Sequence, residues 1–277
     1  MDENITFYYA VWSNRSNIKD RWWINLLFSI ITLRKVYPKN KIKIICYTEP
    51  PKEFLKFQNS LEYDVKYIKQ YYKDYNPKRF NIELLSKLQN CFEISFEEKE
   101  KVILVDSDVF IIKKFTDINW DKVGVYGTHN RNVNTGVVIF DTTKESTKEY
   151  RRLFMNEIEL MLDESIDLVK YIDIAYKGID PTCKMQEENT TRHIFYKYKE
   201  IINTIFYDIG IKNNGINCQD RNDTNNFHLM HMHLDKIAEF VLNHNYFKKN
   251  IVSFFKNEKE FEIISHLHKQ DPMIKFI

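Results

Sequence analysis

Short apolar runs rich in β-branched residues alternate along this chain with longer stretches whose apolar positions recur every three or four residues. The short runs predict strands, which cover residues 5–12, 41–47, 65–68 and 102–105. The longer stretches predict helices, which cover residues 22–37, 52–59 and 81–95. Strands and helices that alternate in this way predict an α/β fold whose parallel strands are joined by right-handed crossovers.

The pattern is less regular after residue 112. It predicts strands over residues 123–126, 137–140 and 227–233 and a helix over residues 148–162. Residues 237–277 have a helical pattern in which aromatic residues stand among lysines and glutamates. Since no internal repeat and no low-complexity linker interrupts the chain, we expect one mixed α/β domain over residues 1–277, with residues 237–277 as a helical tail.

The composition excludes few partners. The 277 residues are 43% hydrophobic, which is enough for a substantial core, and 41 basic residues nearly balance 39 acidic ones, so we expect no nucleic-acid partner. The four cysteines have no metal-binding spacing, which favours a reducing compartment. Neither a signal-peptide pattern nor a transmembrane segment is recognisable, because Asn25, Ser29 and Thr32 interrupt the longest apolar stretch; we therefore expect a cytoplasmic protein.

The strand that begins at Val102 ends in two carboxylates, Asp106 and Asp108, one residue apart. Open α/β sheets bind ligands at the carboxyl ends of their strands. Two carboxylates so close repel each other, and a divalent cation such as Mn²⁺ or Mg²⁺ would compensate them while it also binds a phosphate or diphosphate. Asp-Ser-Asp is also typical of a plain turn, but the apolar run resumes at Val109, which a surface turn would not require.

Two further segments carry candidate chemistry. Asn134-Thr135-Gly136 precedes a predicted strand, where a glycine permits close approach of a ligand; a simple hairpin turn is the alternative. His231 and His233 share one face of a predicted strand, and Lys236 follows them. Neutral imidazoles bind divalent metals, although both histidines could equally be ordinary strand residues.

Taken in order, these motifs resemble the GT-A fold glycosyltransferases, most closely the glycogenin-like glycosyltransferase family 8. The resemblance covers roughly residues 5–240 and rests on four segments: Ser86-Lys87-Leu88, the Asp-x-Asp strand VILVDSDVFIIKKFTDI, the segment NTGVVIF, and the run HMHLDK. The ordered set is far more specific than any one of its members. It implies a GT-A (Rossmann-like) mixed, mostly parallel sheet flanked by helices.

The resemblance also implies an activity. It implies transfer of a hexosyl or N-acetylhexosaminyl group from a UDP-sugar donor to a glycan, protein or small-molecule acceptor, with a bound Mn²⁺ or Mg²⁺. Residues 1–115 would then form the nucleotide-binding half and residues 116–236 the half that binds the acceptor and completes the metal site. The sequence is also compatible with a homodimer.

The resemblance assigns individual residues to these roles. Asp106, Asp108 and His231 would bind the metal, with His233 as the alternative to His231. The donor-binding residues would be Ala10, Trp12, Asn14, Lys87, Asp106, Ser107, Asp108, Asn134, Thr135, Gly136 and Lys236. Trp12 could stack on the base, and an ordinary core aromatic is the alternative. Lys87 and Lys236 would place positive charge at the diphosphate.

The chain departs from the family pattern in three places, one of which is the short spacing from His231 or His233 to Lys236. The Gly and the Pro-Trp that usually follow the C-terminal histidine are absent. Gln186-Glu187-Glu188 only weakly resembles the family segment that carries the residue beneath the reacting carbon. These three residues are our further catalytic candidates beside Lys87. A glutamate there could act as a base and invert the anomeric centre, whereas a glutamine would match the retaining family.

Two other classes compete with a glycosyltransferase. A non-catalytic sugar-nucleotide or glycan-binding protein could use the same fold, because fold does not decide function. A haloacid dehalogenase-type phosphatase also begins with an apolar run and Asp-x-Asp. That family places the motif near its N-terminus and carries Thr or Val where this chain has Phe110, so we favour it least.

Overall fold

The computed structural model describes most of the first two thirds of the chain. The described residues are 4–11, 21–46, 49–67, 82–111, 113–127, 133–163, 165, 186–205, 208–210 and 229–231. None of the helices among them is long and apolar enough to cross a lipid bilayer. The predicted helical tail at residues 237–277 lies outside this part of the chain.

The first half of the chain follows the predicted alternation of strand and helix. Its elements are β1 (Ile5–Val11), α1 (Arg21–Val36), β2 (Lys41–Cys46), α2 (Lys52–Leu55), α3 (Gln58–Leu61), β3 (Tyr63–Tyr67), α4 (Ile82–Glu98) and β4 (Lys101–Val105). The four strands pair in parallel in the order β3-β2-β1-β4, which confirms the predicted parallel arrangement. The single helix expected over residues 52–59 is instead two short helices, α2 and α3.

The second half adds antiparallel pairing. Its described elements are β5 (Val109–Ile111), β6 (Val123–Gly127), β7 (Val133–Asp141), α5 (Glu145–Leu162), α7 (Gln186–Lys197), β8 (Ile202–Ile205), β9 (Asp208–Gly210) and β10 (Leu229–His231). Strand β7 lies between β4 and β6 and runs antiparallel to both, and β8 closes the edge. In the described part of the chain the main sheet is therefore mixed and mostly parallel, as predicted, with the order β3-β2-β1-β4-β7-β6-β8.

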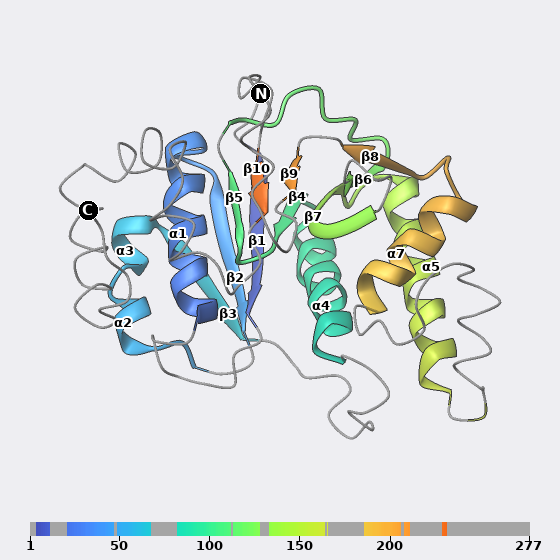
Figure 1. Cartoon of the computed structure of the whole chain (residues 1–277), viewed down its shortest axis with the longest axis horizontal. Helices are drawn as coiled ribbons and strands as arrows, with labels where there is room; N and C mark the ends of the chain where they lie inside the picture. The colour runs from blue at the N-terminus through green and yellow to red at the C-terminus, as the bar shows by residue number, and fades with distance from the viewer. Residues whose placement is uncertain are drawn as a thin grey trace.

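Helices cover both faces of the main sheet (Figure 1): α1, α2 and α3 lie on one side, and α4, α5 and α7 lie on the other. Successive residues of β1 point to opposite faces, as the strand period requires. Phe7 and Tyr9 belong to the core beneath α1, whereas Tyr8 and Ala10 belong to the core beneath α4. A parallel strand buried on both faces explains why β1 is almost continuously apolar.

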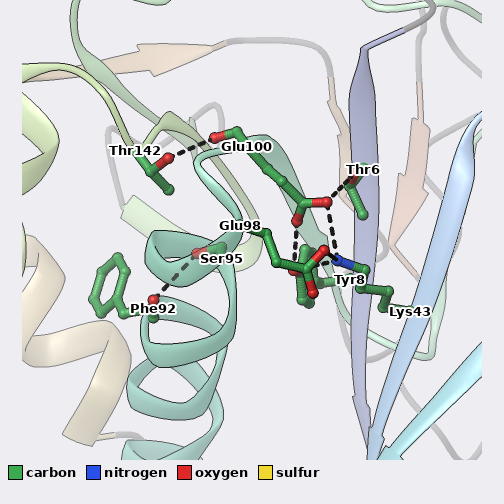
Figure 2. A network of polar contacts seen from close by, with 8 residues as sticks. All are labelled: Thr6, Tyr8, Lys43, Phe92, Ser95, Glu98, Glu100 and Thr142. Atoms are coloured by element: carbon green, nitrogen blue, oxygen red, sulfur yellow. Dashed lines mark hydrogen bonds and ion pairs between the residues drawn. The ribbon is translucent and has the colours of Figure 1, made fainter.

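An ionic network that is buried except at Glu98 joins α4 to the amino ends of the central strands (Figure 2). The Lys43 ammonium on β2 contacts Glu98 at 2.6 Å and Glu100 at 2.9 Å. Glu100 also accepts hydrogen bonds from the Thr6 and Tyr8 hydroxyls of β1, at 2.9 and 2.6 Å. Because a buried charge needs compensation, these contacts hold the end of α4 against β1 and β2.

We expect the network to make the stability of the protein depend on pH. The hydrogen bond from Lys43 lowers the pKa of Glu98 from its ordinary value of 4.5. A lowered pKa adds stability above the unfolded-state pKa, and that contribution is lost as the pH falls through the folded-state pKa. Glu98→Gln should therefore reduce the free energy of unfolding at neutral pH but not below the folded-state pKa. Urea unfolding of both proteins across pH 3–7 measures this; exposed Glu97→Gln is the control, and a pH-independent difference would contradict it.

Candidate active site

Helix α4 places a buried lysine at the carboxyl end of β4. Lys87 is only 2% exposed, and its neighbours Leu88, Cys91 and Phe92 along α4 are buried against the sheet. The Lys87 Nζ atom donates a hydrogen bond to Asp106 Oδ1 at 2.5 Å. Lys87 is therefore an internal counter-ion of the Asp-x-Asp motif and not a solvated lysine of the helix surface.

The start of β7 lies beside the same carboxylate. Because β7 runs antiparallel to β4, its beginning meets the edge of the sheet at which β4 ends. The Asp106 main-chain N–H donates to the Gly136 carbonyl at 2.8 Å, and Lys87 Nζ donates to the Thr135 carbonyl at 3.5 Å. Three of the four segments behind the resemblance thus meet at one point.

The segment Asn134-Thr135-Gly136 lies within a strand, not before one as predicted, and it is not the simple hairpin turn that was the alternative. Strand β7 already begins at Val133, and its pairing with β6 shifts register between Val125 and Tyr126. Asn134 pairs with Tyr126, whereas Val138 pairs with Val125, so β7 bulges over residues 135–137. Bulges of this kind are frequent next to active sites, where they redirect the chain locally.

Asp106 to Val109 form a tight turn, in which the Val109 N–H donates to the Asp106 carbonyl at 3.1 Å. The turn that was the alternative to a metal-binding motif is therefore present. It is buried, however: Ser107 is 2% exposed and Asp108 is 7% exposed. Within the described part of the chain, the Ser107 hydroxyl has no hydrogen-bond partner. An unsatisfied hydroxyl between two carboxylates is costly and marks a position where a polar ligand would be favourable.

After the turn the chain enters a second, smaller sheet with the strand order β5-β10-β9 among the described residues. Strand β10 pairs antiparallel with β5, and His231 lies opposite Val109. The main chain of His231 is thus beside the residue that follows Asp108. The strand predicted over residues 227–233 is confirmed where it is described, while His233 and Lys236 lie outside the described residues.

The other predicted site residues are more scattered. Ala10 is buried on β1, and Trp12 and Asn14 lie outside the described residues. The candidates Gln186, Glu187 and Glu188 are the first residues of α7, a helix that the sequence pattern had not indicated. Helix α7 packs against β7, the strand that carries Thr135 and Gly136.

Sequence reasoning missed two buried hydroxyls next to the turn, those of Tyr9 and Ser29. Ser29 donates to the Val109 carbonyl and lies 2.9 Å from the Tyr9 hydroxyl. The available signal was Ser29 itself, a polar residue in the apolar stretch of α1. Among the side chains that the structure describes, no three from His, Cys, Asp and Glu form a group that could hold a metal ion.

The sheet order, the antiparallel β7 beside β4, and the carboxylates at the end of β4 together define a GT-A-like, Rossmann-like fold. Solved glycosyltransferases share it. GlyE of Streptococcus pneumoniae TIGR4 is 11% identical with a TM-score of 0.55, over 97% of this chain and 64% of GlyE. Mouse xyloside xylosyltransferase 1 is 8% identical with a TM-score of 0.51, over 83% of this chain and 97% of its own.

A third similar structure is the bifunctional glycosyltransferase WbbM, 8% identical with a TM-score of 0.55 over 96% of this chain. The chain spans about half of WbbM (52%) and somewhat less than two thirds of GlyE. The sequence matches no protein-family model and no curated protein. At these identities the similarity shows the fold, and the resemblance to family 8 in particular stays a prediction.

Proposed function

We propose that this protein is a metal-dependent glycosyltransferase that transfers a sugar from a UDP-sugar to an acceptor. The observation that carries the proposal is the meeting of Lys87, Asp106 and the start of β7 at the carboxyl end of β4. This is the edge of an α/β sheet where ligands bind. The fold shared with solved glycosyltransferases supports the same conclusion.

A divalent cation fits the residues of this turn. Asp106 and Asp108 supply two carboxylates, and the Ser107 hydroxyl between them has no hydrogen-bond partner among the described residues. In this proposal Asp106, Asp108 and His231 would hold Mn²⁺ or Mg²⁺, because oxygen and imidazole are ligands that these ions accept. A bound cation would neutralise the charge that develops on the leaving diphosphate.

The protein's own residues would prepare the site for the reaction. Lys87 would present a fixed positive charge near the diphosphate, since its ammonium is held by Asp106 and the Thr135 carbonyl before the donor binds. Lys236 would act on the same oxygens. Ala10, Trp12 and Asn14 would surround the base, and Asn134 and Gly136 would contact the donor sugar.

The stereochemical outcome depends on the residue beneath the reacting carbon. We propose Gln186, Glu187 or Glu188 for this position, because they form the first turn of a helix that packs against β7. Retention follows from the family resemblance and is our first expectation. Proton NMR of the first-formed product distinguishes the anomers, and inversion would point to a glutamate that acts as a base.

A donor screen followed by a turnover assay tests the proposal. A UDP-sugar with Mn²⁺ should raise the melting temperature, because a ligand that binds only the native state stabilises it by mass action. Release of UDP in the presence of a suitable acceptor distinguishes the enzyme from the alternative, a non-catalytic nucleotide-sugar or glycan-binding protein. Absence of any shift with UDP-sugars and Mn²⁺ would contradict the enzyme and a nucleotide-sugar-binding protein, and would leave the glycan-binding alternative. The same screen separates hexosyl from N-acetylhexosaminyl donors.

We expect His231 rather than His233 to complete the metal site. His231 lies opposite Val109, next to Asp108, and a divalent ion bound by two carboxylates and two diphosphate oxygens still lacks ligands. His231→Ala should weaken Mn²⁺ binding severalfold in the presence of UDP, and His233→Ala is the matched control. If only His233→Ala weakens binding, His233 is the ligand. If neither does, this strand holds no metal.

A further inference from the structure

Two buried hydroxyls connect β1 and α1 to the turn that carries the carboxylates. The Ser29 hydroxyl on α1 donates a hydrogen bond to the Val109 carbonyl, 80 residues further along the chain. The Tyr9 hydroxyl on β1 lies 2.9 Å from the same Ser29 oxygen. Tyr9, Ser29 and Val109 are fully buried, so water does not replace these contacts.

The hydrogen bonds between Tyr9 and Ser29 and between Ser29 and Val109 form a relay. The number of hydroxyl hydrogens decides which group donates in each bond. A carbonyl oxygen can only accept, so the single Ser29 hydroxyl hydrogen is used at Val109. The Tyr9 phenol must then donate to the Ser29 oxygen. Burial raises the pKa of the Tyr9 phenol, so it keeps the proton that this bond needs at neutral pH.

The relay acts on the main chain at a sensitive place. Val109 closes the turn that holds Ser107 and Asp108, and it is the residue opposite His231 in the β5–β10 pair. Helix α1 packs against β5. A change in the Ser29 contact would therefore affect both the turn that holds Asp108 and the strand that carries His231. The Val109 carbonyl thus connects the proposed metal ligands Asp108 and His231, through the Ser29 hydroxyl, to Tyr9 on strand β1.

Two other buried hydroxyls in helices, those of Thr32 and Ser95, are satisfied within their own helix. Thr32 Oγ1 donates to the Ser29 carbonyl at 2.8 Å, and Ser95 Oγ donates to the Phe92 carbonyl at 3.4 Å, each three residues back in its own helix. This local bond is the ordinary alternative for a serine or threonine in a helix. Ser29 instead crosses to β5, where its hydroxyl satisfies a main-chain carbonyl beside the candidate site.

We propose that Tyr9 and Ser29 are positioning residues, whose hydroxyl relay holds the Asp106–Val109 turn so that Asp108 and His231 can share one divalent cation. The inference rests on the proposed function. It assigns these two hydroxyls no contact with the substrate: they act through the main chain of Val109.

Matched pairs of variants test the relay. Tyr9→Phe and Ser29→Ala each remove one hydroxyl of the relay. Tyr8→Phe and Ser95→Ala remove equally buried hydroxyls that bond elsewhere, to Glu100 and Phe92. Isothermal titration of Mn²⁺ in the presence of UDP is the readout, with the melting temperature recorded for each variant.

We expect Tyr9→Phe and Ser29→Ala each to weaken Mn²⁺ binding about fivefold, the effect of one lost hydrogen bond. The double variant should be no weaker than Ser29→Ala, because both changes break one relay. Ser29→Thr, which keeps the hydroxyl, should bind as the wild type does. Both controls should keep wild-type Mn²⁺ affinity even where their melting temperatures fall.

The outcomes distinguish failure of this inference from failure of the proposed function on which it rests. Wild-type binding of Mn²⁺ with UDP, together with unchanged affinity in Tyr9→Phe and Ser29→Ala, overturns the relay alone. A control that weakens binding as much as the relay variants also overturns it, because general loss of packing would then explain the effect. A wild-type protein that binds no Mn²⁺ with UDP overturns the proposed function and the relay with it. If Ser29→Ala does not fold, the isosteric Tyr9→Phe decides the result.

Discussion

Replacing Asp108 by alanine should abolish metal-dependent UDP binding and lower kcat/KM by about 10²–10³-fold, the range found when one preorganised electrostatic group is removed from a catalytic site. Asp108 is 7% exposed and lies in the turn at the end of β4, next to Val109. A single remaining carboxylate, Asp106, is already paired with Lys87. We therefore expect little affinity for Mn²⁺ to remain.

Isothermal titration of UDP with Mn²⁺ and then with EDTA measures this effect. The fold should survive, because Asp108 lies in the turn at the carboxyl end of β4 and not within a strand of the sheet; far-UV circular dichroism and the isosteric Asp108→Asn check this point. Asp64→Ala, which removes an exposed carboxylate from β3, should bind as the wild type does. Equal affinity of the wild type for UDP with Mn²⁺ and with EDTA would rule out the metal role.

Replacing Lys87 by alanine should lower kcat/KM at least tenfold, roughly 1.4 kcal/mol of transition-state stabilisation. It should also destabilise the fold, because Asp106 would lose the ammonium that lies 2.5 Å from its carboxylate. The loss should be smaller than the ~3–5 kcal/mol of a fully buried pair. The Asp106 side chain is 29% exposed, so water can replace part of the lost contact.

A second substitution separates the two effects of Lys87. In Lys87→Ala with Asp106→Asn no unpaired carboxylate remains, so stability should recover. Because Asp106 is itself a proposed metal ligand, kcat/KM of the double variant is compared with that of Asp106→Asn alone, and it should be lower still. Lys148→Ala is the control: Lys148 is half-exposed and pairs with Glu145 at 2.5 Å on α5, a surface pair worth about 0–1 kcal/mol. Urea unfolding and steady-state kinetics on the same variants give both quantities. Unchanged kinetics in Lys87→Ala would reduce Lys87 to a purely structural counter-ion.

Local patterns in the sequence were sufficient for the first half of the fold. Strands β1, β2 and β4 and helices α1 and α4 form close to where their apolar periods place them. Their segments are long or strongly apolar, and the short connections leave a right-handed parallel arrangement as the favoured topology. The Asp-Ser-Asp turn was recognisable for the same reason, since it is one short stretch between two apolar runs.

The second half depended on pairing that no short stretch of sequence encodes. Strands β5 and β9 have three residues each, too few for a period to be read, and they form because each pairs with β10, a strand that is separated from both of them along the chain. The antiparallel insertion of β7 between β4 and β6, and the bulge that brings Gly136 to Asp106, arise in the same way.

The sequence by itself named the carboxylates, Lys87 and His231 as candidates, because each stands in a recognisable local motif. Only the tertiary structure decided which of their contacts exist. The Lys87–Asp106 ion pair joins residues 19 apart, and the Ser29–Val109 hydrogen bond joins residues 80 apart. Such contacts depend on how helices pack on the sheet and on which buried polar groups must be satisfied, and these requirements arise only once the chain has folded.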